Sequence, residues 1–119
     1  MEYEVAGDEV VIRDNAHRRI WQGKPEGYVV RWASAVPGSN DGLVLYYYYV
    51  PDKRNQAFKN LVRIRPDGST IWHADLPTRT DTYTNVQLDK RKLTAWSWEG
   101  FTAEIDIETG RILDQLFTK

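Results

Sequence analysis

The sequence predicts an all-β fold, an antiparallel meander of about ten short strands, because three observations agree. Aromatic residues make up 13% of the chain, with five Trp and seven Tyr, and they stand beside β-branched residues in segments such as LVLYYYYV and LTAWSW. Turn-forming residues recur between these segments, as in Pro66-Asp67-Gly68. No segment keeps the helical apolar period of about 3.6 residues over several turns, so little or no helix is expected.

The strands can be placed in chain order from these turns. The first ones lie within Glu2–Gln22, and later ones are expected as two strand pairs and two hairpins: Tyr28–Ser34 with Leu43–Val50, Leu61–Pro77, Thr82–Leu88 with Leu93–Trp98, and Ile105–Asp114. The polar segment Pro51–Asn60 is compatible with either a loop or a helical turn.

One hairpin pattern occurs three times, at Ile12–Trp21, Ile64–Trp72 and Ile105–Asp114. Each copy has an apolar anchor, a turn, and a second apolar position. We expect both sets of apolar residues to point inward, namely Ile12, Ile64 and Ile105 from the first strand and Ile20, Ile71 and Leu113 from the second. The single domain 1–119 would then consist of a partial repeat at 1–22 and two repeats at 28–76 and 82–117.

Two of these copies, RIRPDGSTIW and EIDIETGRIL, resemble the outer strand pair of pyrroloquinoline-quinone-type β-propeller repeats. In that family an apolar-Asp-x-x-Thr-Gly turn precedes an apolar-Trp strand. This chain departs from the pattern at Arg65, which replaces the aspartate, at Asp114, which replaces the tryptophan, and at His17, which stands in place of the glycine. The resemblance implies the fold alone. The quinone-binding residues of the family have no counterpart here, so we expect no cofactor and no dehydrogenase activity.

Two blades and a remnant are too few to close a propeller ring of about four to eight blades. Exposed sheet edges template pairing with other chains, so something must cover them. Three solutions stay open: self-association into a larger ring, one strongly bent or barrel-like sheet, or cover by a partner protein.

Composition narrows the classes of partner. The chain has 119 residues, enough for one domain, with 16 basic and 17 acidic residues and a net charge of -1. This balance disfavours a nucleic-acid partner. The absence of cysteine excludes disulfides and thiolate chemistry. The acidic N-terminus lacks an apolar run, so we expect no signal peptide, no membrane contact and a cytoplasmic location.

Aromatic side chains are the candidate binding residues, and they are Tyr46, Tyr48, Trp96, Trp98 and Trp32. In the tetrad Tyr46–Tyr49, alternation along a strand sends Tyr46 and Tyr48 to one face. Two interpretations remain open for all of these residues. They pack in a core, or they form an exposed surface for a protein or a stacking platform for a sugar or nucleobase.

No catalytic or metal-binding constellation emerges from the sequence. His17 and His73 lack a third ligand nearby, so no metal site is predicted. Glu104, Asp106 and Glu108 alternate along one strand, which suits a solvated face as well as acid-base chemistry, and Glu99 follows Trp98 in a tight turn.

The sequence therefore favours a non-catalytic protein-interaction module, binding through an aromatic sheet face or an exposed edge to a protein partner or to itself. Accessory and immunity-type proteins are comparable in size and type, although no motif is shared with them. The alternative is a small-molecule or glycan binder that uses Trp and Tyr stacking. A hydrolase using Glu99, Glu104 or Asp106 is the third hypothesis.

Overall fold

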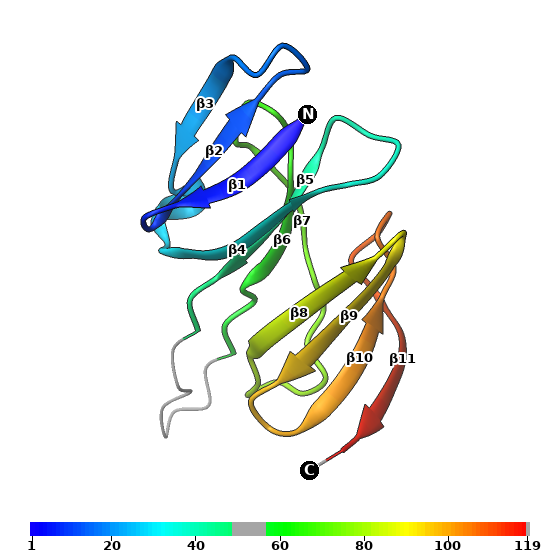
Figure 1. The fold of residues 1–119 in the computed structure, drawn as a ribbon. Coiled ribbons are helices and arrows are strands. Elements are labelled where there is room, and N and C mark those ends of the chain that lie inside the picture. The colour runs from blue at the N-terminus through cyan, green and yellow to red at the C-terminus, as the bar shows by residue number, and fades with distance from the viewer. Residues whose placement is uncertain (49–56, 119) are drawn as a thin grey trace.

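The computed structural model describes residues 1–48 and 57–118, which form eleven antiparallel strands in three sheets (Figure 1). The all-β prediction is confirmed. Among the described residues there is no α-helix, and a short 3₁₀ turn occupies Pro25–Gly27. Tyr49, Val50 and most of the predicted polar segment, residues 51–56, lie outside the described residues.

Each sheet is a meander in which the strand order follows the chain. Sheet A contains β1 (Glu2–Ala6), β2 (Glu9–Arg13) and β3 (Arg19–Gly23). Sheet B contains β4 (Val30–Ala35), β5 (Gly42–Tyr46), β6 (Leu61–Ile64) and β7 (Thr70–His73). Sheet C contains β8 (Tyr83–Asp89), β9 (Lys92–Ser97), β10 (Phe101–Ile105) and β11 (Ile112–Phe117).

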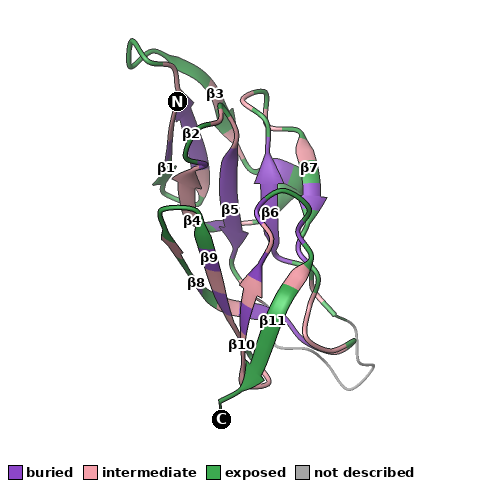
Figure 2. Cartoon of the chain, turned by 90° about the vertical axis from the view of Figure 1, so that its right-hand side faces the viewer, coloured by how far each residue is buried: buried purple, intermediate pink, exposed green. Residues whose placement is uncertain are grey.

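Sheet B is the middle layer of a stack (Figure 1), and Figure 2 shows β5 and β6 buried. Alternation along β5 sends Val44 and Tyr46 into the core shared with sheet A, and Leu43 and Leu45 into the core shared with sheet C. Burial on both faces explains why β5 is apolar at every side chain. The alternative of one bent or barrel-like sheet is wrong, because the strands form three separate sheets and none closes.

The same contact joins sheet A to sheet B and sheet B to sheet C. A Cβ built on Gly68 would lie 2.5 Å from the Trp21 ring, and one built on Gly110 would lie 2.7 Å from the Trp72 ring. The ring at the end of one hairpin therefore lies directly on the turn glycine of the next. The corresponding turn position in the first hairpin is His17, which adopts the same left-handed conformation with φ 62°.

The hairpins also share a bulge, which corrects one expectation. Ile12, Ile64 and Ile105 are buried as predicted, but Ile20, Ile71 and Leu113 are exposed by 44%, 36% and 60%. The pairing register shifts next to these three residues in β3, β7 and β11. Each is the extra residue of a bulge, so simple alternation does not apply to it, and its side chain turns to solvent.

Sheets B and C are further joined at the backbone carbonyl of Ile107. Arg63 Nη1 donates a hydrogen bond to this oxygen at 2.8 Å, and Trp72 Nε1 donates a second at 3.1 Å. Arg63 is buried, and its charge is balanced by Asp41, whose Oδ2 accepts from Nη2 at 2.9 Å. The turn between β10 and β11 is thereby fixed against sheet B.

The two outer faces of the stack are mainly polar, although Trp96 and Leu116 lie on the outer face of sheet C. On sheet A, Arg13 pairs with Glu4 at 3.2 Å and Gln22 donates to Glu9 at 2.9 Å. On sheet C, Thr102 and Glu104 alternate with the buried Ala103 and Ile105. Polar outer faces are what terminal layers of a stack require, because nothing covers them.

Replacing Gly110 by alanine tests the contact between Trp72 and the turn. Gly110 has φ +77°, and the new Cβ would overlap the Trp72 ring. Gly7 is the matched control, since its φ is +65° and nothing lies within 4 Å of a Cβ placed there. We expect Gly7→Ala to cost about 1–2 kcal/mol from backbone strain, and Gly110→Ala to cost about 1–3 kcal/mol more from overpacking. Urea denaturation measures both, and equal losses would contradict a tight packing role for Gly110.

Candidate functional site

The aromatic residues predicted to bind do not form one surface. Tyr46 is fully buried between sheets A and B, and Trp32 packs against the core between sheets B and C. Trp96 pairs in register with Thr102 and so lies on the polar outer face of sheet C. Tyr48 and Trp98 do meet, since their ring centroids are 6.0 Å apart. The structure thus separates the five residues into core positions, a sheet face and one small cluster.

The cluster around Trp98 lies where the turn between β9 and β10 approaches the end of β5. Trp98 is 43% exposed, and Tyr47 is 52% exposed and stacked on Tyr48 with a centroid distance of 5.5 Å. The Arg31 guanidinium carbon lies 5.5 Å from the Tyr48 ring centre, which is a cation-π distance. This cluster presents one accessible indole ring beside a tyrosine.

Tyr46 is the buried member of a hydrogen-bonded group that extends to the protein surface. Its hydroxyl donates to Glu26 Oε1 at 2.9 Å, while His73 Nε2 lies 2.7 Å from Glu26 Oε2. Burial, followed by the neighbouring Glu26 carboxylate, raises the pKa of the Tyr46 hydroxyl well above its usual range. Tyr46 therefore joins three segments of the fold and is not accessible to a ligand.

Glu99, one of the carboxylates considered for hydrolysis, has structural partners, and so has the neighbouring Asp81. Glu99 Oε2 accepts hydrogen bonds from the hydroxyls of Thr78 and Thr80 at 2.9 and 2.6 Å. Asp81 Oδ1 accepts from the backbone N–H groups of Thr82 and Glu99 at 2.9 and 3.1 Å. These bonds attach the turn between β9 and β10 to the segment that leads into β8.

Glu104 lies on the solvated outer face of sheet C. The expectation that Glu104, Asp106 and Glu108 alternate along one strand is wrong, because β10 ends at Ile105 and the chain turns there. Asp106 Oδ1 accepts a hydrogen bond from the Glu108 N–H in this turn at 2.9 Å. Within residues 1–48 and 57–118, no group of three or more His, Asp or Glu side chains is arranged to hold a metal ion.

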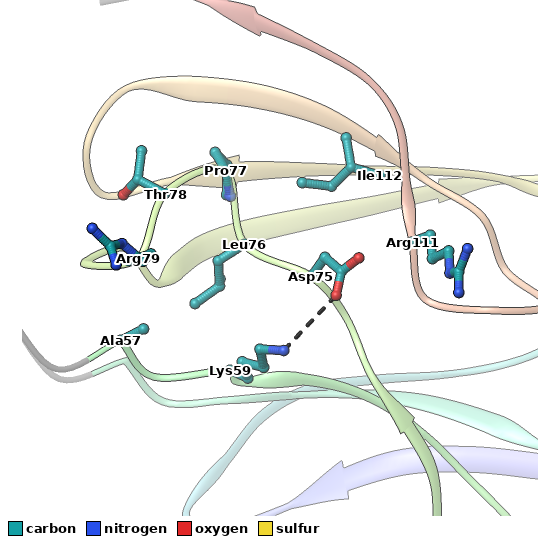
Figure 3. A pocket seen from close by; sticks show the side chains of 9 residues that line it. All are labelled: Ala57, Lys59, Asp75, Leu76, Pro77, Thr78, Arg79, Arg111 and Ile112. Carbon is teal, nitrogen blue, oxygen red and sulfur yellow. Dashed lines mark ion pairs between the residues drawn. The ribbon is translucent and has the colours of Figure 1, made fainter.

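A groove of about 620 Å³ lies between the segment joining β7 to β8 and the start of β11 (Figure 3). Its apolar lining comes from Leu76, Pro77 and Ile112, and Leu76 and Ile112 also pack against the core between sheets B and C. The remaining lining residues are mainly charged: Lys59, Asp75, Arg79 and Arg111, with Ala57 and Thr78. The groove therefore combines an apolar floor with a charged rim, a composition typical of binding sites.

The rim of the groove carries three cations and one carboxylate. Lys59 Nζ lies 3.8 Å from Asp75 Oδ1, and both side chains are 53% exposed, so this pair is worth at most about 1 kcal/mol. No described residue accepts a hydrogen bond from the guanidinium of Arg79 or Arg111 or pairs with it. Figure 3 shows these two arginines at opposite ends of the groove, with Lys59 and Asp75 between them. The excess of positive charge favours a ligand with carboxylate groups.

Strand β11 forms one edge of sheet C, and no described strand pairs with its outer side. Its side chains Leu116, Leu113 and Phe117 are exposed by 66%, 60% and 58%, more than any other large apolar residues described. Figure 2 shows β11 exposed along almost its whole length. Such an edge, with free backbone groups and no basic residue within the strand, is a template for another strand.

The edge and the groove are continuous, because Arg111 and Ile112 line the groove and Ile112 is also the first residue of β11. Sequence reasoning expected an exposed edge but did not assign it to a strand, and it missed the groove. The signal for the edge was present in ILDQLF, where four of six residues are apolar although the strand ends the last hairpin. The groove left no local signal, since its residues come from three separate segments.

Three stacked antiparallel meanders with an open, apolar edge define an all-β protein with a candidate binding edge. The chain belongs to the family described as "Domain of unknown function (DUF7957)", whose model matches residues 35–117. The match runs from the last residue of β4 to the end of β11, so it includes the edge and the groove but not sheet A.

A comparison with curated proteins finds no match for this chain. In the part of the chain that the structure describes, no helix is long and apolar enough to cross a membrane.

Raising the pH tests the burial of Tyr3, Tyr46 and Tyr83, whose pKa values are all raised chiefly by burial. Their folded-state pKa exceeds the unfolded value near about 10, so their stabilising effect is complete below that pH and is lost as the pH rises above it. We expect each to lower the free energy of unfolding by about 1.4 kcal/mol per pH unit there. Urea unfolding across this range measures the slope.

Tyr46→Phe provides the control for this titration. The variant should show a shallower pH dependence of stability, while the phenolate absorbance of the folded protein near pH 10 stays unchanged. Loss of a phenolate signal from the folded protein in this variant would mean that Tyr46 is accessible, contrary to its burial.

Proposed function

We propose that this protein is a non-catalytic protein-interaction module that pairs an extended segment of a partner protein with the open edge of β11. The observation that carries the proposal is that the three most exposed large apolar side chains described lie on this one edge strand. Addition of a strand to a sheet edge supplies main-chain hydrogen bonds for affinity, and the side chains supply specificity. The expected cytoplasmic location is part of the proposal.

The edge is a better candidate than a sheet face. Both outer faces of the stack carry ion pairs or alternating polar residues, which do not favour a dry interface. The same polarity argues against ring closure by stacking a second copy on either face. A partner strand at β11 would instead extend sheet C beyond four strands and cover Leu113, Leu116 and Phe117.

We also propose that the three sheets are propeller-type repeats, the first of them incomplete. The repeated contact of Trp21 with Gly68 and of Trp72 with Gly110 supports this assignment, as does the shared bulge. In the third hairpin the tryptophan position is Asp114, which pairs with Glu104 on the outer face of sheet C. A charged residue there does not provide the ring that Trp21 and Trp72 place on the turn glycine of the following hairpin.

Lysine at two exposed edge positions tests the function. We expect the wild-type protein to select peptides with a short apolar run from a random displayed library, with affinities in the micromolar range. Leu113→Lys/Leu116→Lys should weaken binding of the selected peptides at least about tenfold, because edge lysines oppose strand pairing and remove apolar contact. Isothermal calorimetry or fluorescence anisotropy measures the change.

Ile20→Lys is the matched control, since Ile20 occupies the corresponding bulge position in β3 and is also exposed. It should leave peptide affinity unchanged. Equal binding by wild type and the edge variant would overturn the proposal. A concentration-dependent dimer in light scattering that Leu116→Lys abolishes would overturn it too, because the occupant of the edge would then be a second copy.

A second candidate function is glycan binding at the Trp98 cluster, favoured by the exposed indole of Trp98 beside Tyr48. Sugars stack on accessible aromatic rings, so a binding sugar should change the tryptophan fluorescence of the protein. In a sugar panel, Trp98→Ala should abolish the response and Trp96→Ala, on the outer face of sheet C, should keep it. A panel without any response would remove this candidate.

A further inference from the structure

We propose that the groove at the start of β11 binds acidic side chains, Asp or Glu, of the partner segment. In the partner's sequence these residues stand on the C-terminal side of the apolar run that pairs with β11. This inference rests on the proposed pairing at β11 and specifies the chemistry of the partner. Its basis is a cationic groove that continues directly from the edge strand.

The direction of the partner follows from the direction of β11. This strand runs from Ile112, which lines the groove, to Phe117 at the far end. Antiparallel pairing is the commoner arrangement, and all pairs in this protein that the structure describes adopt it. An antiparallel partner would pass Phe117 and Leu116 first and reach the groove with its C-terminal residues.

The charge of the groove determines what those residues must be. Arg111 stands at the end nearest β11, Lys59 and Asp75 lie in the middle, and Arg79 stands at the far end (Figure 3). The guanidiniums of Arg79 and Arg111 have no acceptor among the described residues, and the Lys59–Asp75 pair is long and half-exposed. A guanidinium without a partner can bind a carboxylate through two hydrogen bonds. Carboxylates on the partner would therefore find an unpaired guanidinium at each end of the groove, with the half-exposed Lys59 between them.

The apolar floor adds a second requirement. Leu76, Pro77 and Ile112 are partly buried and leave apolar surface between the charged groups. An acidic segment with at least one apolar residue among its carboxylates fits both the floor and the rim. A purely ionic ligand would leave the floor uncovered, so the floor favours a peptide segment with mixed character.

Parallel selections test this inference. A random peptide library is fused through its C-terminus to the N-terminus of the display protein, so that no free terminal carboxylate exists. It is selected on wild type and on Arg79→Glu/Arg111→Glu. We expect peptides selected by wild type to carry Asp or Glu after the apolar run. Their affinity should fall at least about tenfold in the variant and should weaken as salt is raised. Peptides selected by the variant should lack the acidic residues.

Arg18→Glu/Arg19→Glu is the control, since it makes the same change of charge on exposed arginines beside and in β3, on sheet A. It should leave the affinity of the acidic peptides unchanged. Two results separate the two proposals. Peptides that depend on Leu113 and Leu116 but show no acidic preference would overturn the groove inference alone, whereas failure to select any peptide would overturn the proposed function and this inference together.

Discussion

The Ile107 carbonyl and the neighbouring Gly110 turn are the contact on which the C-terminal half of the structure depends. Two donors from sheet B, Arg63 and Trp72, reach the same oxygen, and the Trp72 ring lies on Gly110. Asp75 N–H also donates to the Gly110 carbonyl at 2.8 Å. These bonds attach the turn before β11 to sheet B and to the segment after β7. The groove exists because this attachment brings Arg111 beside Asp75 and Leu76.

The alternation of apolar and polar residues along the strands is the basis on which the sequence predicts much of the fold. The hairpin anchors Ile12, Ile64 and Ile105 are buried as alternation predicts, because a period of two is enforced wherever one face meets a core. Ile20, Ile71 and Leu113 were expected inside and are outside. A bulge adds a residue to one strand only, and its position depends on turn geometry in three dimensions, which an alternating pattern does not encode.

The candidate site was less accessible to sequence reasoning than the fold. The aromatic residues were predicted to bind because large aromatic side chains are common in binding surfaces. Tyr46 is instead a core residue, because β5 is covered on both faces. The groove is made by Lys59, by the segment from Asp75 to Arg79, and by Arg111, which are distant in sequence and individually ordinary. Such a site depends on how two sheets stack, and stacking is a long-range property of the fold.

The polar face of the last sheet explains why an edge, and not a face, is the candidate binding surface. Trp21 and Trp72 each lie on the turn glycine of the following hairpin, but Asp114 takes the third tryptophan position and stands opposite Glu104 on a polar face. The series of face contacts therefore stops at sheet C. The outer face of sheet C is mainly polar and needs no covering layer. By contrast, β11 keeps unpaired backbone groups and exposed Leu113, Leu116 and Phe117. The remaining unsatisfied surface is thus linear, and a linear surface with free backbone groups suits an extended chain better than a folded face.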